Sequence, residues 1–522
     1  CKKYDGVTNS VYFYDGLDET GNPDGGYHGP CEGRLTCVCF PKGHESYVYD
    51  DHGRITRIRS HIDGRSRIIT MTYDEADRIK TETLPTGEVL TYTYGEDGNL
   101  VSINGEEPYA TDIEYTAYGK LKQICYGNGI TTTYSYYDDN TGDPSNDYRT
   151  HSYHLRAIFL KDSNGYVTTT TGYGYDEAGN LKIKTFLDDD GTYYSEEFEY
   201  DPYNRLTSAS SPELYGNLSY TYDSMNNILT KEGRIYHYET EVDGRALPHA
   251  VSRVEDSNGN PMFTHEYDKN GNMTAVRGQS KITIRARGTG TDLDPPVMEL
   301  WMDGEKQSAW TITNTEYREF TWYGYWNTAS KVDVVFANDN TAGGEETNLF
   351  VDWVEVNGVR KESDEGNVSY DQGTYSAGCF DGTNVLPGQE QLDVTGALRF
   401  AFVGVLVMDR TIGYDYENRM VSINDNGTTA RFSYNARGKR VMKRVNGTTT
   451  YYFFPNYHEI VTTEGTQAVT YYFGPTGRIA QRSVIGEENE LLYIHTDHLG
   501  SAVRLTDSDG DVVQRMAYDP YG

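Results

Sequence analysis

The chain has 522 residues and a formal net charge of −33 at pH 7, which argues against a nucleic-acid-binding surface, since such a surface needs a basic patch. Tyrosine (47 residues) and glycine (54 residues) are over-represented, a composition that favours a sheet with one solvated face over a close-packed globule. The longest apolar run, residues 398–408, contains Arg399 and is too short to cross a bilayer, so we expect no transmembrane segment.

Residues 1–46 are rich in glycine and cysteine and show weak periodicity, so we interpret them as an irregular lead-in. Cys31, Cys37 and Cys39 lack the paired spacing of a zinc site, and we expect structural thiols that are free or locally bridged. No signal peptide is visible at the start of the chain. We therefore interpret the chain as part of a longer protein, with a lipidated Cys1 of a mature lipoprotein as the alternative.

A short motif recurs in residues 47–276 and 410–522: an aromatic residue, an Asp-like residue, two free positions, Gly or Asn, a polar residue and an apolar one. Only residues that tolerate a left-handed backbone stand at the fourth position of the turn. These residues are Gly53, Asp77, Gly98, Gly179, Asn204, Asn226, Gly271, Asn418 and Gly438. Each motif therefore predicts a β-hairpin turn closed by a bulge, with its Asp or Asn bonding forward to the turn backbone.

The segments between the turns alternate β-branched or aromatic residues with polar ones, as in residues 91–94 and 131–136. This alternation predicts strands with one buried face. A period of roughly 20 to 25 residues gives one hairpin per repeat, and such units bury their apolar face only against their neighbours. We therefore predict an all-β fold built from a long coiled sheet of hairpins.

The motif is missing between Asp268 and Tyr414, and all five tryptophans lie in this gap. We interpret residues 277–360 as an inserted domain whose ends return to adjacent strands of the repeat sheet, because that arrangement leaves the host strands paired. Its short alternating segments predict a β-sandwich of jelly-roll-like form. Residues 361–409 are then the return segment, and the repeats resume over residues 410–522.

The repeats resemble the YD-repeat or Rhs family, which includes bacterial polymorphic toxins, the C components of insecticidal toxin complexes and the teneurins. The resemblance rests on the Tyr-Asp turns, on residues 126–134 (YGNGITTTY) and on residues 493–501 (YIHTDHLGS), and it covers roughly residues 47–276 and 410–522. It implies a hollow β-shell that encloses a C-terminal cargo, commonly a toxin. In this family the self-cleavage segment and the toxin would follow residue 522.

The inserted domain carries a second resemblance, to the calcium-dependent xylan-binding carbohydrate modules. It rests on residues 335–339 (VFAND) and 348–358 (NLFVDWVEVNG) and covers roughly residues 280–358. It implies a calcium ion (Ca2+) that binds paired sugar hydroxyls and takes about six to eight oxygen ligands. The positions that match or neighbour the family's calcium ligands are Asp339, Glu345, Glu346 and Asn348. The sequence has Glu346 where the family has Asp, and Thr347 where it has Arg.

Aromatic residues of the insert are candidates for stacking on a sugar ring. Trp322, Tyr325 and Trp326 cluster in the sequence, and aromatic faces suit this contact. Trp353 alternates with apolar neighbours and is predicted to lie in the core. The alternative is a sandwich that serves only as a spacer, with solvated acidic turn residues. We expect the insert to face outward, because inside a closed shell it would compete with the cargo for space.

No catalytic motif is evident. His495 and His498 flank Asp497, but these residues alternate on a strand that leads into a Gly turn, and the resembling family uses this stretch structurally. No nucleophile elbow, phosphate loop, metalloprotease helix or spaced carboxylate pair is found in the sequence. We therefore expect a chain that is not an enzyme, with any protease or toxin activity lying beyond residue 522.

The sequence favours an encapsulating shell of a toxin-like bacterial protein, secreted or displayed at the cell surface, with a glycan-binding insert for targeting. Its expected partners are a polysaccharide, xylan-like or another glycan, and an enclosed C-terminal toxin cargo. The alternative is a cell-surface adhesin or scaffold that binds carbohydrate and carries no cargo. A third hypothesis, a glycan-processing enzyme with a targeting module, is disfavoured because the repeats offer no catalytic constellation.

Overall fold

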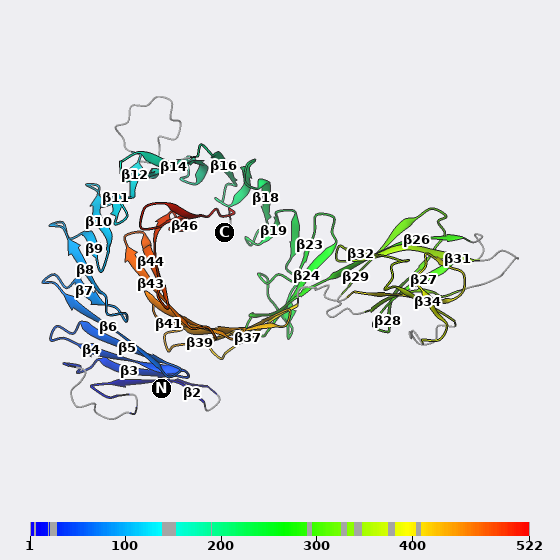
Figure 1. Cartoon of the computed structure of the whole chain (residues 1–522), viewed down its shortest axis with the longest axis horizontal. Helices are drawn as coiled ribbons and strands as arrows, with labels where there is room; N and C mark the ends of the chain where they lie inside the picture. Colours follow the sequence, from blue (N-terminus) through cyan, green and yellow to red (C-terminus); the bar gives the residue numbers. More distant parts are fainter. Residues whose placement is uncertain are drawn as a thin grey trace. The chain divides into compact units, whose positions relative to one another are not determined.

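The computed structural model describes residues 2–4, 7–18, 20, 29–137, 153–188, 190–289, 295–324, 331–338, 347–373, 382–402 and 409–520. Every regular secondary-structure element in these residues is a β-strand (Figure 1), which confirms the predicted all-β fold. Within the same ranges there is no helix with the length and apolar character needed to cross a bilayer. Contacts divide the chain into a first unit (Cys1–Asp223, Tyr414–Ser422, Thr429–Gly522) and a second unit (Ser224–Gly413, Ile423–Thr428).

The first unit is built from consecutive antiparallel strands, each bonded to the next along the chain. Its N-terminal strands are β1 (Lys2–Tyr4), β2 (Val7–Tyr14), β3 (Leu35–Phe40), β4 (Gly43–Tyr49), β5 (Ile55–Ile62), β6 (Arg65–Tyr73), β7 (Ile79–Thr83), β8 (Val89–Tyr94), β9 (Leu100–Asn104), β10 (Pro108–Tyr115), β11 (Leu121–Tyr126), β12 (Thr131–Tyr136), β13 (Leu155–Lys161), β14 (Val167–Tyr175), β15 (Leu181–Leu187), β16 (Tyr193–Tyr200), β17 (Leu206–Ser211) and β18 (Gly216–Tyr222). After the insert come β37 (Asp409–Tyr414), most of which belongs to the second unit, and β38 (Met420–Asp425), which is divided between the two units. The first unit then continues with β39 (Thr428–Tyr434), β40 (Arg440–Val445), β41 (Thr448–Phe454), β42 (Tyr457–Val461), β43 (Thr466–Gly474), β44 (Gly477–Ile485), β45 (Glu488–Thr496), β46 (Ala502–Thr506) and β47 (Val512–Arg515).

The turns of the repeat have the predicted geometry. The residues at the fourth turn position all have positive φ, from 58° at Asn418 to 87° at Gly179. The strand register shifts at the Tyr of the motif, as between Val48 and Tyr49 and between Thr72 and Tyr73. The prediction of hairpin turns closed by a bulge is therefore confirmed.

The Asp of the motif holds its own turn together, as Asp74 illustrates. Its Oδ1 accepts hydrogen bonds from the backbone N–H groups of Ala76 (2.9 Å) and Arg78 (3.0 Å), and its Oδ2 accepts one from Arg78 Nε (2.8 Å). These donors, the Arg78 side chain first, hold the pKa of the Asp74 carboxyl below its ordinary value. The same bonds are made by Asp50, Asp176, Asp201, Asp256, Asp268 and Asp415.

In several hairpins the last turn residue links the hairpin to the next one, as Arg78 illustrates. The Arg78 guanidinium lies 4.3 Å from the centroid of the Tyr94 ring and donates to the Gly98 carbonyl at 3.3 Å. The Tyr94 hydroxyl donates back to the carbonyl of Ile79 at 2.9 Å. The same return bond is made by Tyr49, Tyr73, Tyr136, Tyr175, Tyr200, Tyr222, Tyr267, Tyr434 and Tyr518. We call these Asp, Arg and Tyr contacts together the turn lock.

The first unit has two layers, because its C-terminal strands lie inside the arc of its N-terminal strands (Figure 1). Glu88 is 5% exposed, and its carboxylate accepts hydrogen bonds from the hydroxyls of Tyr109 (2.5 Å), in the outer layer, and Tyr472 (2.8 Å), in the inner layer. Similar polar contacts between the layers join Glu45 to Asn435, Glu82 to Asn456, Arg67 to Glu459, Asn128 to Thr506 and Asp188 to Arg504. Buried groups that need specific partners fix the register of the two layers.

The interpretation of residues 1–46 as an irregular lead-in is wrong for the described part of that segment. β2 pairs with β3, β3 with β4 and β4 with β5, so the hairpin sheet begins well before residue 47. Cys37 and Val38 are buried at 0% and 1% exposure, since cysteine serves as a small apolar residue in β3. The glycines and cysteines of the segment had concealed this strand pattern. The thiols of Cys31 and Cys125 are free.

The hairpins of the second unit are formed by β19 (Ile228–Lys231), β20 (Arg234–His237), β21 (Glu241–Val242), β22 (Arg245–Ala246), β23 (Arg253–Glu255), β24 (Pro261–Tyr267) and β25 (Met273–Gly278). β25 pairs with β37 through Ala275 and Thr411, Val276 and Arg410, and Arg277 and Asp409. The chain between these two strands forms a separate β-sandwich, so the prediction that the insert returns to an adjacent strand is confirmed.

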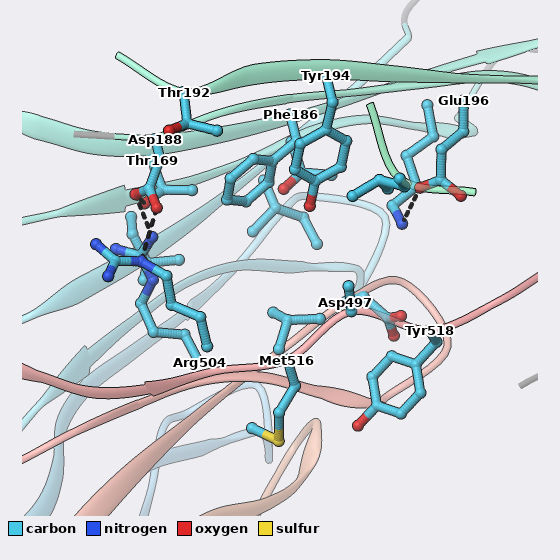
Figure 2. A pocket seen from close by; sticks show the side chains of 18 of the residues that line it. Thr169, Phe186, Asp188, Thr192, Tyr194, Glu196, Asp497, Arg504, Met516 and Tyr518 are labelled. Carbon is cyan, nitrogen blue, oxygen red and sulfur yellow. Dashed lines mark hydrogen bonds and ion pairs between the residues drawn. The ribbon is translucent and has the colours of Figure 1, made fainter. Parts of the chain in front are cut away.

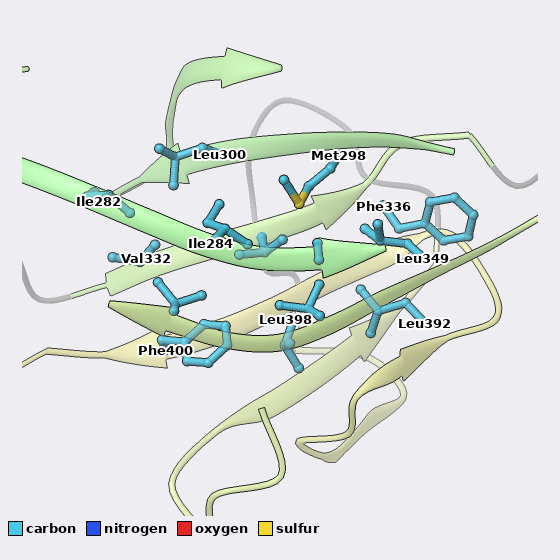
Figure 3. Close-up of a cluster of buried hydrophobic side chains, with 14 of the residues drawn as sticks. Ile282, Ile284, Met298, Leu300, Val332, Phe336, Leu349, Leu392, Leu398 and Phe400 are labelled. Atoms are coloured by element: carbon cyan, nitrogen blue, oxygen red, sulfur yellow. The ribbon is translucent and has the colours of Figure 1, made fainter. Parts of the chain in front are cut away.

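The sandwich consists of two sheets with a closed apolar core (Figure 3). Its strands are β26 (Ser280–Thr289), β27 (Val297–Met302), β28 (Glu305–Thr311), β29 (Arg318–Gly324), β30 (Lys331–Phe336), β31 (Asn348–Val356), β32 (Val359–Glu362), β33 (Ser369–Gln372), β34 (Val385–Pro387), β35 (Gln391–Leu392) and β36 (Gly396–Ala401). One sheet has the order β29-β26-β31-β32 with β35 against β31, and the other has the order β28-β27-β30-β36-β33-β34. Ile282 and Ile284 of the first sheet meet Leu300 and Phe400 of the second in this core.

The predicted boundary at residue 360 is corrected, because described strands of the supposed return segment belong to the sandwich. β36 pairs with β30 on one side and with β33 on the other. Leu398 and Phe400 are fully buried, and Arg399 points the other way and makes a bidentate pair with Asp333 at 2.7 and 2.5 Å. The apolar run at 398–402 is therefore an inner strand of a sheet, and the sandwich extends to about residue 402.

The turn lock predicts that Tyr73→Phe weakens the link between neighbouring hairpins by about 1 kcal/mol, because it removes the hydrogen bond to the Ile55 carbonyl but keeps the ring under Arg54. Hydrogen exchange should then be about fivefold faster in the hairpin that contains residues 49–80. Tyr118→Phe is the control, since Tyr118 is a turn residue that is 72% exposed. Equal protection in the two variants would contradict the lock.

Candidate functional site

One end of the sandwich presents the base of the loop that follows β30. Asn338 anchors this base: its amide accepts from the backbone N–H of Val297 and donates to the carbonyl of Pro295 at 3.1 Å. On the far side of the loop, Asn348 begins β31 and its backbone N–H donates to Thr289 Oγ1 at 3.2 Å. The side-chain Oδ1 of Asn348 is buried and has no hydrogen-bond partner within the part of the chain that is described.

An unpartnered buried carbonyl oxygen is costly unless another donor or a cation satisfies it. Asn348 Oδ1 is such an oxygen, and it belongs to the set of calcium ligands that the sequence predicts. The other three, Asp339, Glu345 and Glu346, lie outside the described residues. Among the described residues no group of three or more His, Cys, Asp and Glu side chains is placed to hold a metal ion.

Of the three predicted sugar-stacking residues, the structure describes Trp322. Trp322 lies on β29, where it pairs in register with the buried Ile282 and packs, partly buried, against the sandwich core. Tyr325 and Trp326 lie outside the described residues. Trp353 is 5% exposed, as predicted for a core position, and the Arg360 guanidinium lies 3.6 Å from its ring centroid.

The first unit contains a cavity of about 270 Å³ between its two layers (Figure 2). At one end Asp188, whose side chain is 3% exposed, pairs with Arg504 and with Arg515 Nε at 2.8 Å. Farther along the cavity Lys184 pairs with Glu196 at 2.7 Å. Because Asp188 and Glu196 are both held in ion pairs, we interpret the cavity as part of the contact between the layers and not as a reactive centre. Sequence reasoning missed it, because Asp188 and Arg504 lie 316 residues apart.

His495 and His498 lie in the packed interface of the same unit. The ring of His495 is fully buried, with Nε2 at 2.9 Å from Thr506 Oγ1 and its centroid 4.8 Å from that of Tyr126. Burial, with the charge of Arg504 adding to it, lowers the pKa of His495 to about 3, so the imidazole is neutral. The geometry agrees with the structural role expected for this stretch.

Three family models match parts of the chain. Residues 281–371 match the model described as a calcium-dependent, xylan-binding carbohydrate-binding module (CBM60). Residues 404–522 match the teneurin YD-shell model, and residues 49–89 and 73–107 match the RHS repeat model. Both resemblances seen in the sequence are thereby confirmed.

Similar proteins cover the chain to different extents. The tRNA3(Ser)-specific nuclease WapA of Bacillus spizizenii is 24% identical over 219 residues, which are 40% of this chain and 9% of that protein. The Tc holotoxin pore of Photorhabdus luminescens matches 98% of this chain and 21% of its own, with 14% identity and a TM-score of 0.48. The vCBM60 module in complex with galactobiose matches 23% of this chain and 97% of its own, with 23% identity and a TM-score of 0.18. The chain thus spans about a tenth of the curated relative and about a fifth of the toxin chain.

The burial of His495 predicts a loss of stability in acid. The pKa of its imidazole is about 3 in the folded chain against 6.5 ordinarily, so between these values only the unfolded chain binds the proton. Stability is therefore full above pH 6.5 and falls as the pH is lowered toward 3. We expect His495→Gln, whose amide can still bond Thr506, to show a smaller fall in unfolding temperature between pH 7 and about pH 4.

The matched control is His52→Gln, because His52 is an exposed turn residue of the same unit. Its unfolding temperature should follow that of the parent chain at every pH. A fall of equal size in all three proteins would show that the buried imidazole does not set the acid sensitivity.

Proposed function

We propose that the chain is a non-enzymatic YD-repeat shell of a secreted or surface-displayed bacterial protein, and that its inserted sandwich tethers the shell to polysaccharide through calcium. The observation that carries the proposal is the pairing of β25 with β37 on either side of the sandwich. This pairing keeps the repeat sheet hydrogen-bonded across the insertion, so the sandwich is an added module and not part of the wall. A module added in this way serves binding, and we propose that it faces outward.

The proposed calcium ion is held by Asn348 Oδ1 together with carboxylates of Asp339, Glu345 and Glu346. Asn348 Oδ1 supports this choice because it is a buried acceptor without a partner in the described chain. Oxygen donors of this kind suit calcium, and the ion would supply open coordination positions for two sugar hydroxyls. Tyr325 and Trp326 are the proposed sugar-stacking residues, and Trp322 braces the strand that leads to them.

The proposed cargo is a polypeptide enclosed by the repeat sheet. The layered packing of the first unit supports this, since buried contacts such as Glu88 with Tyr472 give the wall a fixed register that resists opening. WapA, which matches part of the chain, is by its name a nuclease, and we propose that any such activity here resides in the cargo and not in residues 1–522. The coding sequence downstream of residue 522 tests this part: a variable domain after further repeat sequence supports enclosure, and its lack would leave a display scaffold.

Calorimetric titration of the full chain with xylan and galactan oligosaccharides tests the tether. We expect binding in calcium that disappears in excess chelator, and Asn348→Ala should weaken it by about tenfold or more because a ligand oxygen is lost. Asp364→Ala is the control: it removes an exposed carboxyl from the same sandwich and should leave the affinity for the oligosaccharides unchanged. Absence of sugar binding by the folded chain in calcium would refute the tether and leave the sandwich as a spacer.

A further inference from the structure

The outer face of the first sandwich sheet carries an arginine that is held between aromatic rings. The Arg287 guanidinium lies 3.7 Å from the centroid of the Phe350 ring and 5.1 Å from that of Tyr317. Arg287 and Phe350 are register partners on β26 and β31, so their side chains share this face. Stacking on both rings fixes the plane of the guanidinium and leaves its N–H edge available.

Arg287 differs from its basic neighbours in having no acidic partner. Arg285 pairs with Asp352, and Arg360 pairs with Glu355 at 3.2 Å. Arg287 is half-buried and makes no ion pair within the described residues, although the whole chain has a net charge of −33. A guanidinium that is partly desolvated and lacks a counter-charge favours an anion from outside the protein.

Two buried polar atoms beside Arg287 also lack partners within the described chain. The Tyr317 hydroxyl is one of them, and its ring lies beneath both Arg285 and Arg287. Asn348 Oδ1 is the other, and Asn348 lies next to Arg287 because its register partner is Thr289 on β26. Side chains alternate along a strand, so Asn348 and Phe350 lie on one face. Arg287 and the residues that carry the two unpaired oxygens therefore lie on neighbouring segments at the same end of the sheet.

We propose that Arg287, Tyr317 and Phe350 form a subsite for the carboxylate of a uronic acid residue, so the polysaccharide that the module binds is an acidic one. This inference rests on the proposed calcium-dependent tether and names its ligand class. The planar guanidinium offers two parallel N–H donors to a planar carboxylate. Asn348 places this subsite beside the proposed calcium loop, so one oligosaccharide can reach both.

Titration of the full chain with a matched pair of sugars tests the inference: xylotetraose, and the same oligosaccharide bearing one glucuronic acid branch. We expect the acidic sugar to bind about tenfold more tightly, a preference that falls as salt screens the charge. Arg287→Gln should abolish the preference and leave the affinity for xylotetraose unchanged. Arg318→Gln removes an exposed arginine from the adjacent strand β29 and should preserve the preference.

The outcomes separate this inference from the function on which it rests. Equal calcium-dependent binding of both sugars would overturn the acidic subsite and leave the tether intact. Failure of the folded chain to bind either sugar would overturn both. Binding of the acidic sugar that survives chelation and is lost in Arg287→Gln would support the subsite and refute the calcium tether. Should Arg287→Gln fail to fold, Arg287→Lys serves instead: it keeps the charge but not the planar fork, and an undiminished preference would contradict the proposed geometry.

Discussion

The fold depends on a carboxylate that is satisfied inside its own turn. In a chain with a large excess of negative charge, acidic residues stabilise the fold only where their oxygen lone pairs meet donors. The Asp of the motif does so at Asp50, Asp74, Asp176, Asp201, Asp256, Asp268 and Asp415, where it meets two backbone N–H groups and the side chain at the end of the turn. Where that side chain is Arg, it also stacks on the Tyr of the next hairpin. One interaction therefore shapes the turn and sets the spacing of successive hairpins.

This local device leaves the faces of the sheet free for a different task. In the first unit the inner layer packs on the outer layer, and buried carboxyl groups such as those of Glu88 and Glu459 meet hydroxyl or guanidinium donors from the opposite layer. Such groups are expensive to expose without a partner and so favour one register over its neighbours. The sandwich has an apolar core of its own, which its two sheets close.

The local features of the fold could be predicted from the sequence, because the turn motifs and the period-two alternation of strands each depend on residues that are close together in the sequence. The left-handed residues, the bulges and the paired ends of the insert are examples. Partners remote in sequence could not be predicted. β36 has the alternation of a strand, but no residue near it in the sequence indicates that it lies between β30 and β33, and the sequence therefore predicts a return segment there. The contacts of Arg287 with Tyr317 and Phe350 have no local signal for the same reason, since they join separate segments. Asn348, in contrast, lies in a motif that can be read from the sequence.

A crystal structure of the full chain grown with calcium and a xylo-oligosaccharide decides whether the insert is a calcium-dependent glycan tether. We expect a calcium ion bonded to Asn348 Oδ1 and to carboxylates of residues 339–346, with two sugar hydroxyls completing its coordination at the usual calcium–oxygen distances of about 2.3 to 2.6 Å. A sugar bound away from this loop, or a calcium ion held elsewhere while Asn348 Oδ1 stays without a partner, would contradict it.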